Sequence, residues 1–255
     1  MGPLSPAHRI GRRNLHAAFP ERDPDWIEAT LRGAWENLGR VAGEYVHLGN
    51  LWDYDVQHPS TGRIITDDSK LFSHLQDDGQ PALCFAAHLG NWELPAVMAA
   101  AHDMPSAVLY RMPNNKAVAR EIFRIRAPLM GHLIRSRAQA PLEMAAALER
   151  GEHLGMLVDQ HFTRGVDVTF FGRRCKANPS IARLARQFEC PVVGIRVIRL
   201  SDHRFRIAAE GPFNLPHDAD GRIDVPQSTQ MITSVIERWI REYPEQWLWF
   251  HRRWR

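Results

Sequence analysis

The chain has 255 residues, of which 44% are hydrophobic and 24% charged. This composition supplies a large globular core and excludes disorder over most of the chain. Three dispersed cysteines exclude a disulfide framework or a zinc knuckle, and we expect them to be reduced, in a cytoplasmic setting. The net charge is +3, and only three of the 32 basic residues are lysines, so the sequence favours planar partners such as phosphates and carboxylates. The sequence has neither a run of 18 apolar residues nor a signal-peptide pattern.

The predicted elements alternate between helix and strand along the chain. Asp23-Pro24 should cap a helix whose apolar stripe runs to Val41. We predict strands at 82–87, 106–110, 154–158 and 191–200, and helices near 92–101, 115–130, 141–150 and 179–189. Residues 191–200 and 204–213 should form an edge hairpin, which a helix from Pro226 to Tyr243 follows. This order indicates an α/β fold, with a mostly parallel central sheet flanked by helices and a helical N-terminal segment.

No repeat, low-complexity tract or linker divides the sequence. We therefore expect a single domain over residues 1–255, with a helical lead-in over 1–50 and an α/β core over 80–255.

Histidine followed five positions later by an acidic residue occurs twice, at His16 with Glu21 and at His88 with Glu93. Twelve of the 13 histidines have a residue five positions on, and with 29 acidic residues in 255 chance alone predicts roughly 1.4 such pairs, so the spacing carries no weight by itself. His16 lies in a stretch with a helical pattern, and we interpret it as a surface histidine. His88, in contrast, directly follows an apolar strand, and ligands of open α/β sheets bind beyond the carboxyl ends of strands.

Such a strand-end histidine is suited to acyl transfer. A neutral His88 would take the proton of an attacking hydroxyl, and Glu93, by accepting from its other ring nitrogen, would fix the tautomer. No Gly-x-Ser-x-Gly elbow supplies a serine nucleophile. The alternative is a structural pair at a helix cap.

Four blocks in order resemble the lipid A biosynthesis acyltransferases, the late lauroyl/myristoyl transferases of the lysophospholipid acyltransferase superfamily. The blocks are His88-Leu-Gly-Asn-Trp-Glu93, then Tyr110-Arg-Met-Pro-Asn-Asn115, then Gly155-Met-Leu-Val-Asp-Gln160 with Phe170-Phe-Gly172, and finally Pro244-Glu-Gln-Trp-Leu-Trp-Phe-His-Arg-Arg-Trp254. The stretch from Arg12 to Leu51 is also similar to the helical lead-in of that family. The resemblance implies a fold like that of glycerol-3-phosphate acyltransferase.

The resemblance also implies roles for individual residues. His88 would be the general base and Glu93 its orienting partner. Asn91 would shape the turn and, with Asn114, belong to the substrate-binding set. Arg111 would clamp a phosphate or aid the oxyanion, or else form a structural salt bridge.

Asp159 and Gln160 follow another apolar strand, so they should reach the same rim as His88. Asp159 would pair with Arg111, bind a sugar hydroxyl or be structural. The sequence departs from the family at Met112, where Arg-Pro is often continuous, and at His161, where a second aspartate is common.

The reaction implied is transfer of a fatty acyl chain from acyl carrier protein, or from acyl-CoA, to a hydroxyl of a lipid A precursor. Another glycolipid or a lysophospholipid is the alternative acceptor. No metal, organic cofactor or nucleic acid is implied. We expect the protein to act at the cytoplasmic face of the inner membrane, held there peripherally or through an N-terminal anchor absent from this chain.

Two rival classes are distinct in chemistry. A metal-dependent hydrolase would recruit His153, Asp159 and His161 as ligands. A non-catalytic module would bind a membrane surface or nucleic acid through the Arg/Trp-rich C-terminus, where Trp247 and Trp249 either meet lipid or, as we favour, close the core.

Overall fold

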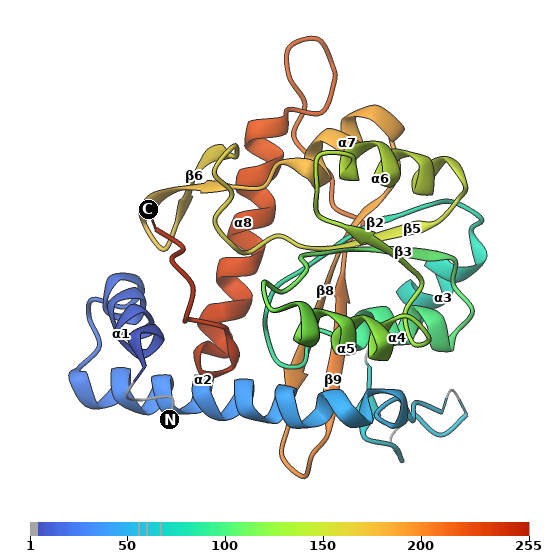
Figure 1. Ribbon diagram of the computed structural model, residues 1–255. Coiled ribbons are helices and arrows are strands. Elements are labelled where there is room, and N and C mark those ends of the chain that lie inside the picture. Colours follow the sequence, from blue (N-terminus) through green and yellow to red (C-terminus); the bar gives the residue numbers. More distant parts are fainter. Residues whose placement is uncertain (1–4, 56, 60, 67, 255) are drawn as a thin grey trace.

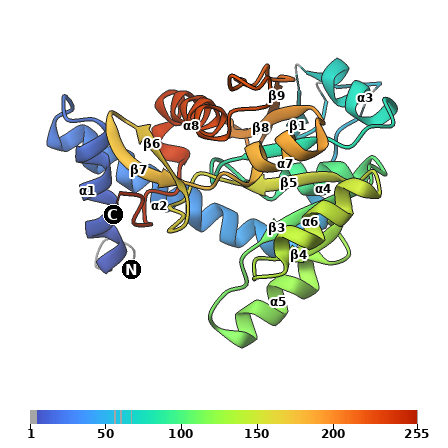
Figure 2. The same ribbon diagram turned by 90° about the horizontal axis from the view of Figure 1, so that it is seen from above.

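The computed structural model describes residues 5–55, 57–59, 61–66 and 68–254. Its centre is a sheet in the order β1-β9-β8-β2-β5-β3-β4, in which every neighbouring pair is parallel except β8 and β9. The strands are β1 (Ile64–Ile65), β2 (Leu83–Ala86), β3 (Ser106–Tyr110), β4 (His132–Arg135), β5 (His153–Leu157), β8 (Val192–Arg199) and β9 (Phe205–Glu210). The predicted mostly parallel α/β fold is confirmed. Figure 2 shows the sheet from β9 at one side to β4 at the other.

Helices cover both faces of this sheet. Helices α3 (Ser69–Asp77), α4 (Leu94–Ala101) and α5 (Lys116–Arg126) lie on one face, and α6 (Ala140–Glu149), α7 (Ser180–Phe188) and α8 (Val225–Glu242) lie on the other (Figure 1). The ring of Trp239 in α8 stacks on Phe85 of β2 at a centroid distance of 5.6 Å. A separate antiparallel hairpin joins β6 (Val166–Phe170) to β7 (Arg173–Ala177).

The N-terminal segment is helical, as predicted. It comprises α1 (Pro6–Ala18), α2 (Pro24–Glu44) and the 3-10 helix η2 (Tyr45–Asn50). The side chain of Asp23 accepts from Trp26 N at 2.7 Å and so caps α2. Helix α2 runs across one end of the molecule, below α8 in Figure 1, and the loop that joins β8 to β9 extends past it.

The C-terminal tryptophans belong to the core. Trp247 and Trp249 are 1% and 0% exposed, so the alternative that they meet lipid is wrong, and packing is confirmed. A second 3-10 helix, η3 (Pro244–Gln246), precedes them. The side chain of Asn14 in α1 donates to the carbonyl oxygens of Trp249 and His251 at 2.8 and 2.7 Å. The two ends of the chain are thereby joined.

No helix in the described part of the chain is long and apolar enough to cross a bilayer.

Candidate active site

His88 lies just past the carboxyl end of β2, at the start of a tight turn. The turn requires glycine at position 90, because Gly90 has φ +58° and a Cβ there would lie 2.2 Å from the carbonyl oxygen of Val197. Behind the turn, α4 begins at Leu94. The imidazole of His88 is 18% exposed and lines a cavity.

The partner of His88 is Asp159, which follows the adjacent strand β5. The Nδ1 atom of His88 lies 2.8 Å from Oδ1 of Asp159, whose side chain is fully buried. The other carboxylate oxygen, Oδ2, accepts from the backbone N–H of His88 at 3.0 Å and from the indole N–H of Trp247 at 2.7 Å. A carboxylate only accepts, so Nδ1 carries the proton and Nε2 is left as the basic nitrogen.

The electrostatics keep Asp159 ionised. Burial alone would raise the pKa of Asp159, but the charge and the hydrogen bond of His88 outweigh it and hold that pKa well below its usual range. Burial lowers the pKa of the nearby His251 to about 4, although the Asp159 carboxylate acts in the opposite direction. At neutral pH the carboxylate therefore faces an uncharged His251.

The predicted contact between Glu93 and His88 is wrong. Glu93 is 4% exposed and forms a two-point ion pair with Arg126 of α5, at 2.9 Å from Nε and 2.5 Å from Nη2. The turn at 89–92 carries Glu93 to the start of α4, where its carboxylate meets α5. Closeness in sequence suggested the wrong carboxylate, since the true partner comes from another strand.

We expect Glu93→Gln to act on stability more than on catalysis. The substitution leaves the buried Arg126 cation without its counter-charge, so the free energy of unfolding should fall by about 1–3 kcal/mol in urea titrations. The folded variant should keep its rate of acyl transfer within a few-fold of the wild type. As a control, Glu121→Gln, which breaks the exposed Glu121–Arg124 pair, should change stability by less than about 1 kcal/mol. A folded Glu93→Gln variant without activity would contradict this expectation and indicate that Glu93 takes part in catalysis.

An apolar cavity of about 380 Å³ extends inward from His88. It lies between the sheet and helices α3, α4 and α5. Its walls at the His88 end include Trp92, Tyr110 and Gln160, and at the far end Leu75, Met104, Ser106 and His153. A parallel sheet is normally buried on both faces, but alternate residues of β2 and β5 are only partly buried. This pattern marks the face of the sheet that opens on the cavity.

Among the other predicted site residues, Arg111 and Gln160 border the cavity. Arg111 follows β3 and is exposed, with no ion-pair partner among the described residues, so the predicted pairs with Asp159 or with a structural carboxylate are not formed. The amide nitrogen of Gln160 is 3.5 Å from Nε2 of His88. Asn114 is exposed and outside the cavity lining, and its neighbour Asn115 caps α5 through Ala117 N at 2.9 Å.

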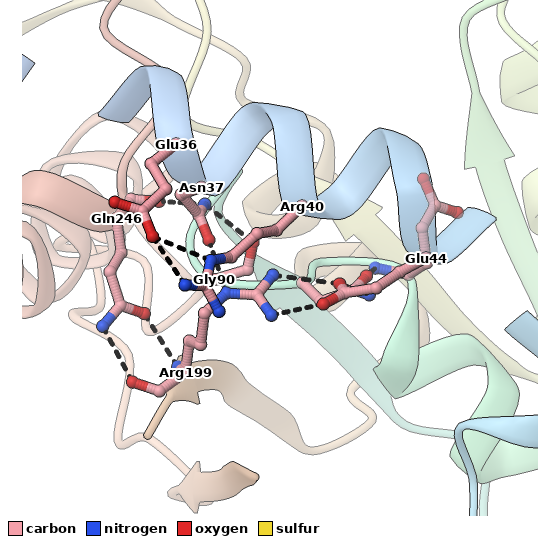
Figure 3. Close-up of polar contacts among 9 residues, drawn as sticks. Glu36, Asn37, Arg40, Glu44, Gly90, Arg199 and Gln246 are labelled. Atoms are coloured by element: carbon pink, nitrogen blue, oxygen red, sulfur yellow. Dashed lines mark hydrogen bonds and ion pairs between the residues drawn. The ribbon is translucent and has the colours of Figure 1, made fainter. Parts of the chain in front are cut away.

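A polar network behind the turn ties it to α2 (Figure 3). The amide of Asn37 donates to the carbonyl oxygens of Gly90 and Gln246, both at 3.0 Å. The side chain of Gln246 exchanges two hydrogen bonds with the backbone of Arg199, at 2.7 and 3.0 Å. The guanidinium of Arg199 then donates to Oδ1 of Asn37 at 3.0 Å, which closes the circuit.

Asn91 belongs to this network rather than to the cavity. Its side chain donates to Glu44 at 2.8 Å and accepts from the N–H of Glu93 at 3.2 Å. Glu44 also binds Arg199 in a two-point ion pair (Figure 3). The bond to the Glu93 backbone agrees with the predicted part of Asn91 in shaping the turn. Asn91 is 1% exposed and lies outside the cavity lining, so its predicted place among the substrate-binding residues is not supported. Sequence reasoning missed Asn37, Glu44 and Arg199, because no local pattern links them to the turn.

The metal-site alternative does not fit the geometry. His153 begins β5 and Asp159 follows its end, so the two lie roughly 20 Å apart along the strand. Within the described residues, no three histidine, cysteine or acidic side chains come close enough to share a metal ion.

The fold and the site together define an α/β protein with a histidine–carboxylate pair at the mouth of an apolar cavity. A family model of the bacterial lipid A biosynthesis acyltransferases matches residues 4–255, so the chain belongs to that family. The resemblance seen in the sequence is thereby confirmed, and the protein is a lipid A-type acyltransferase, which uses an acyl donor and a lipid acceptor. A search of curated protein sequences gives no significant match.

Proposed function

We propose that the protein transfers a fatty acyl chain, of the lauroyl or myristoyl type, from acyl carrier protein or acyl-CoA to a hydroxyl of a lipid A precursor. One observation carries this proposal. The imidazole of His88 has one nitrogen bonded to a buried carboxylate at 2.8 Å and lines an apolar cavity. That arrangement supports the proposal, because it would put a proton acceptor at the mouth of a cavity suited to a long apolar chain.

The chemistry needs only these two side chains. Nε2 of His88 takes the proton of the acceptor hydroxyl while that oxygen attacks the carbonyl carbon of the thioester. When the tetrahedral intermediate collapses, the carbon–sulfur bond breaks, and the imidazolium returns the proton to the departing thiolate. Asp159 stabilises the imidazolium during the interval and holds the ring in the required tautomer.

The cavity lining supports an acyl chain as the substrate group. Apart from its mouth, the cavity is bounded mainly by aliphatic side chains of α4 and of β2, β3 and β5. Burying methylene groups there is favourable by about 0.8 kcal/mol each. The thioester of a chain seated in the cavity would stand beside His88.

Arg111 is the residue we assign to charge recognition at the mouth. Its guanidinium is exposed at the end of β3 and unpaired among the described residues. A phosphate of the donor's prosthetic arm or of the acceptor lipid would give it a bidentate partner. Action at the cytoplasmic face of the inner membrane is part of the proposal.

The lipid A of cells with and without the gene tests this proposal. We expect mass spectrometry to show that the deletion strain lacks one secondary acyl chain on lipid A. The wild-type gene should restore that chain, and a gene encoding His88→Ala should not. Unchanged lipid A, with an acyl chain missing from another glycolipid or phospholipid, would contradict the assigned acceptor and favour the alternative one.

A further inference from the structure

The cavity exists because small side chains face it from both sides. On the sheet, these positions are Cys84 and Ala86 of β2, Ser106 of β3 and Gly155 of β5, and α4 contributes Ala96 and Ala99. Intervening residues such as Phe85 and Met156 pack in the core on the opposite face. A larger residue at any of these positions would fill part of the space.

Gly155 is the position where an added side chain meets least resistance. A Cβ at this residue would have only ordinary contacts, at 3.8 Å from the carbonyl oxygen of Ala107 and 3.9 Å from Cγ2 of Val108. The backbone of Gly155 is not in the left-handed region, so neither strain nor a backbone clash requires glycine here. A side chain at this position would therefore extend into the open space of the cavity.

The register of the sheet gives the depth of Gly155. It pairs with Cys84 of β2, and His88 lies four residues further along the chain from Cys84. Four strand residues span roughly 13 Å. An extended hydrocarbon chain advances by about 1.25 Å per carbon, because carbon–carbon bonds of about 1.5 Å meet near the tetrahedral angle. A chain whose carbonyl carbon is beside His88 would thus pass Gly155 at roughly its eleventh carbon.

We infer that Gly155 determines the acyl-chain length by leaving the inner part of the cavity open to chains longer than about ten carbons. The inference rests on the proposed function, in that it takes the cavity to hold the acyl chain. Beyond Gly155, the cavity continues to Ser106 and His153, which pair two residues deeper. A bulky side chain at 155 would close this inner part and leave the outer part and His88 unchanged.

Binding of free fatty acids to the purified protein tests the inference without relying on turnover. By calorimetry, Gly155→Met should weaken the binding of myristate by at least about tenfold, because each methylene kept out of the cavity weakens binding by about fourfold. Binding of octanoate should stay within about threefold of the wild type. Gly155→Ala should give a smaller loss in the same direction, and it serves as the second variant if Gly155→Met does not fold. Gly39→Met is the matched control, since a Cβ at this exposed position of α2 meets nothing within 4 Å, and it should change neither affinity.

The outcomes separate this inference from the proposed function. Myristate binding within threefold of the wild type in a folded Gly155→Met or Gly155→Ala variant would overturn the role of Gly155, as would a wild-type protein that binds no fatty acid. If the wild type binds myristate and Gly155→Met does not, but neither transfers an acyl chain to a lipid A precursor, the inference stands and the proposed function fails. If transfer occurs, Gly155→Met should favour the shorter donor by at least about tenfold relative to the wild type.

Discussion

Replacement of His88 by alanine is expected to lower kcat/KM for acyl transfer by about 10²–10⁴-fold, the usual contribution of a positioned general base. The loss should appear in kcat, because the cavity that would hold the acyl chain does not depend on the imidazole. Its 18% exposure and its place on the cavity wall predict a small effect on folding. Steady-state rates with an acyl thioester donor, together with thermal unfolding, measure both effects.

His16→Ala is the matched control for that substitution. His16 is also followed five residues later by a glutamate, but its side chain is exposed on α1. This variant should transfer acyl chains at the wild-type rate. Near-wild-type activity of a folded His88→Ala variant would remove His88 from the mechanism.

Replacement of Asp159 by asparagine is expected to lower kcat by a similar factor, about 10²–10⁴-fold. The carboxylate accepts three hydrogen bonds, from His88 N, His88 Nδ1 and Trp247 Nε1, and an asparagine of the same shape would turn an N–H group toward one of these donors. The amide also cannot stabilise an imidazolium. Rates and KM values for the donor and the acceptor measure the effect, with KM expected to change little.

Asp159→Asn removes a carboxylate that is fully buried, so a matched exposed site is needed for comparison. Asp167 lies on β6, is 79% exposed and pairs with Lys176 at 3.2 Å. Asp167→Asn should leave the rate unchanged. A folded Asp159→Asn variant with wild-type kcat would contradict the assignment of Asp159 as the partner of His88.

The sequence was sufficient to predict which edge of the sheet carries the site. His88 and Asp159 each follow an apolar strand, and the carboxyl ends of parallel strands meet at one edge, so both were expected on the same rim. Their pairing could not be predicted, because it depends on β5 lying next to β2. The chain first forms β3 and β4 and then returns to the middle of the sheet, where β5 lies between β2 and β3. Glu93 is nearer to His88 in sequence than Asp159 is. No local pattern indicates that Arg126, at the end of α5, forms an ion pair with the Glu93 carboxylate.

Elements with weak patterns were also missed. Strand β4 and helix α3 were not predicted, and the helix expected over 115–130 ends at Arg126. In β4, only Ile134 is buried, so the four-residue segment has too little apolar alternation to indicate a strand. The β6–β7 hairpin has exposed basic residues next to its turn. Its buried residues are covered where the hairpin packs on α8, and a local sequence pattern does not show this packing.

The claim that His88 and Asp159 act as one catalytic unit is tested most directly by a double-mutant cycle on kcat. Residues that act as a unit give losses that do not add. The double variant His88→Ala/Asp159→Asn should therefore be no slower than His88→Ala alone, within about threefold. A double variant slowed by the product of the two single losses would show that the two side chains contribute independently, and would contradict the pair.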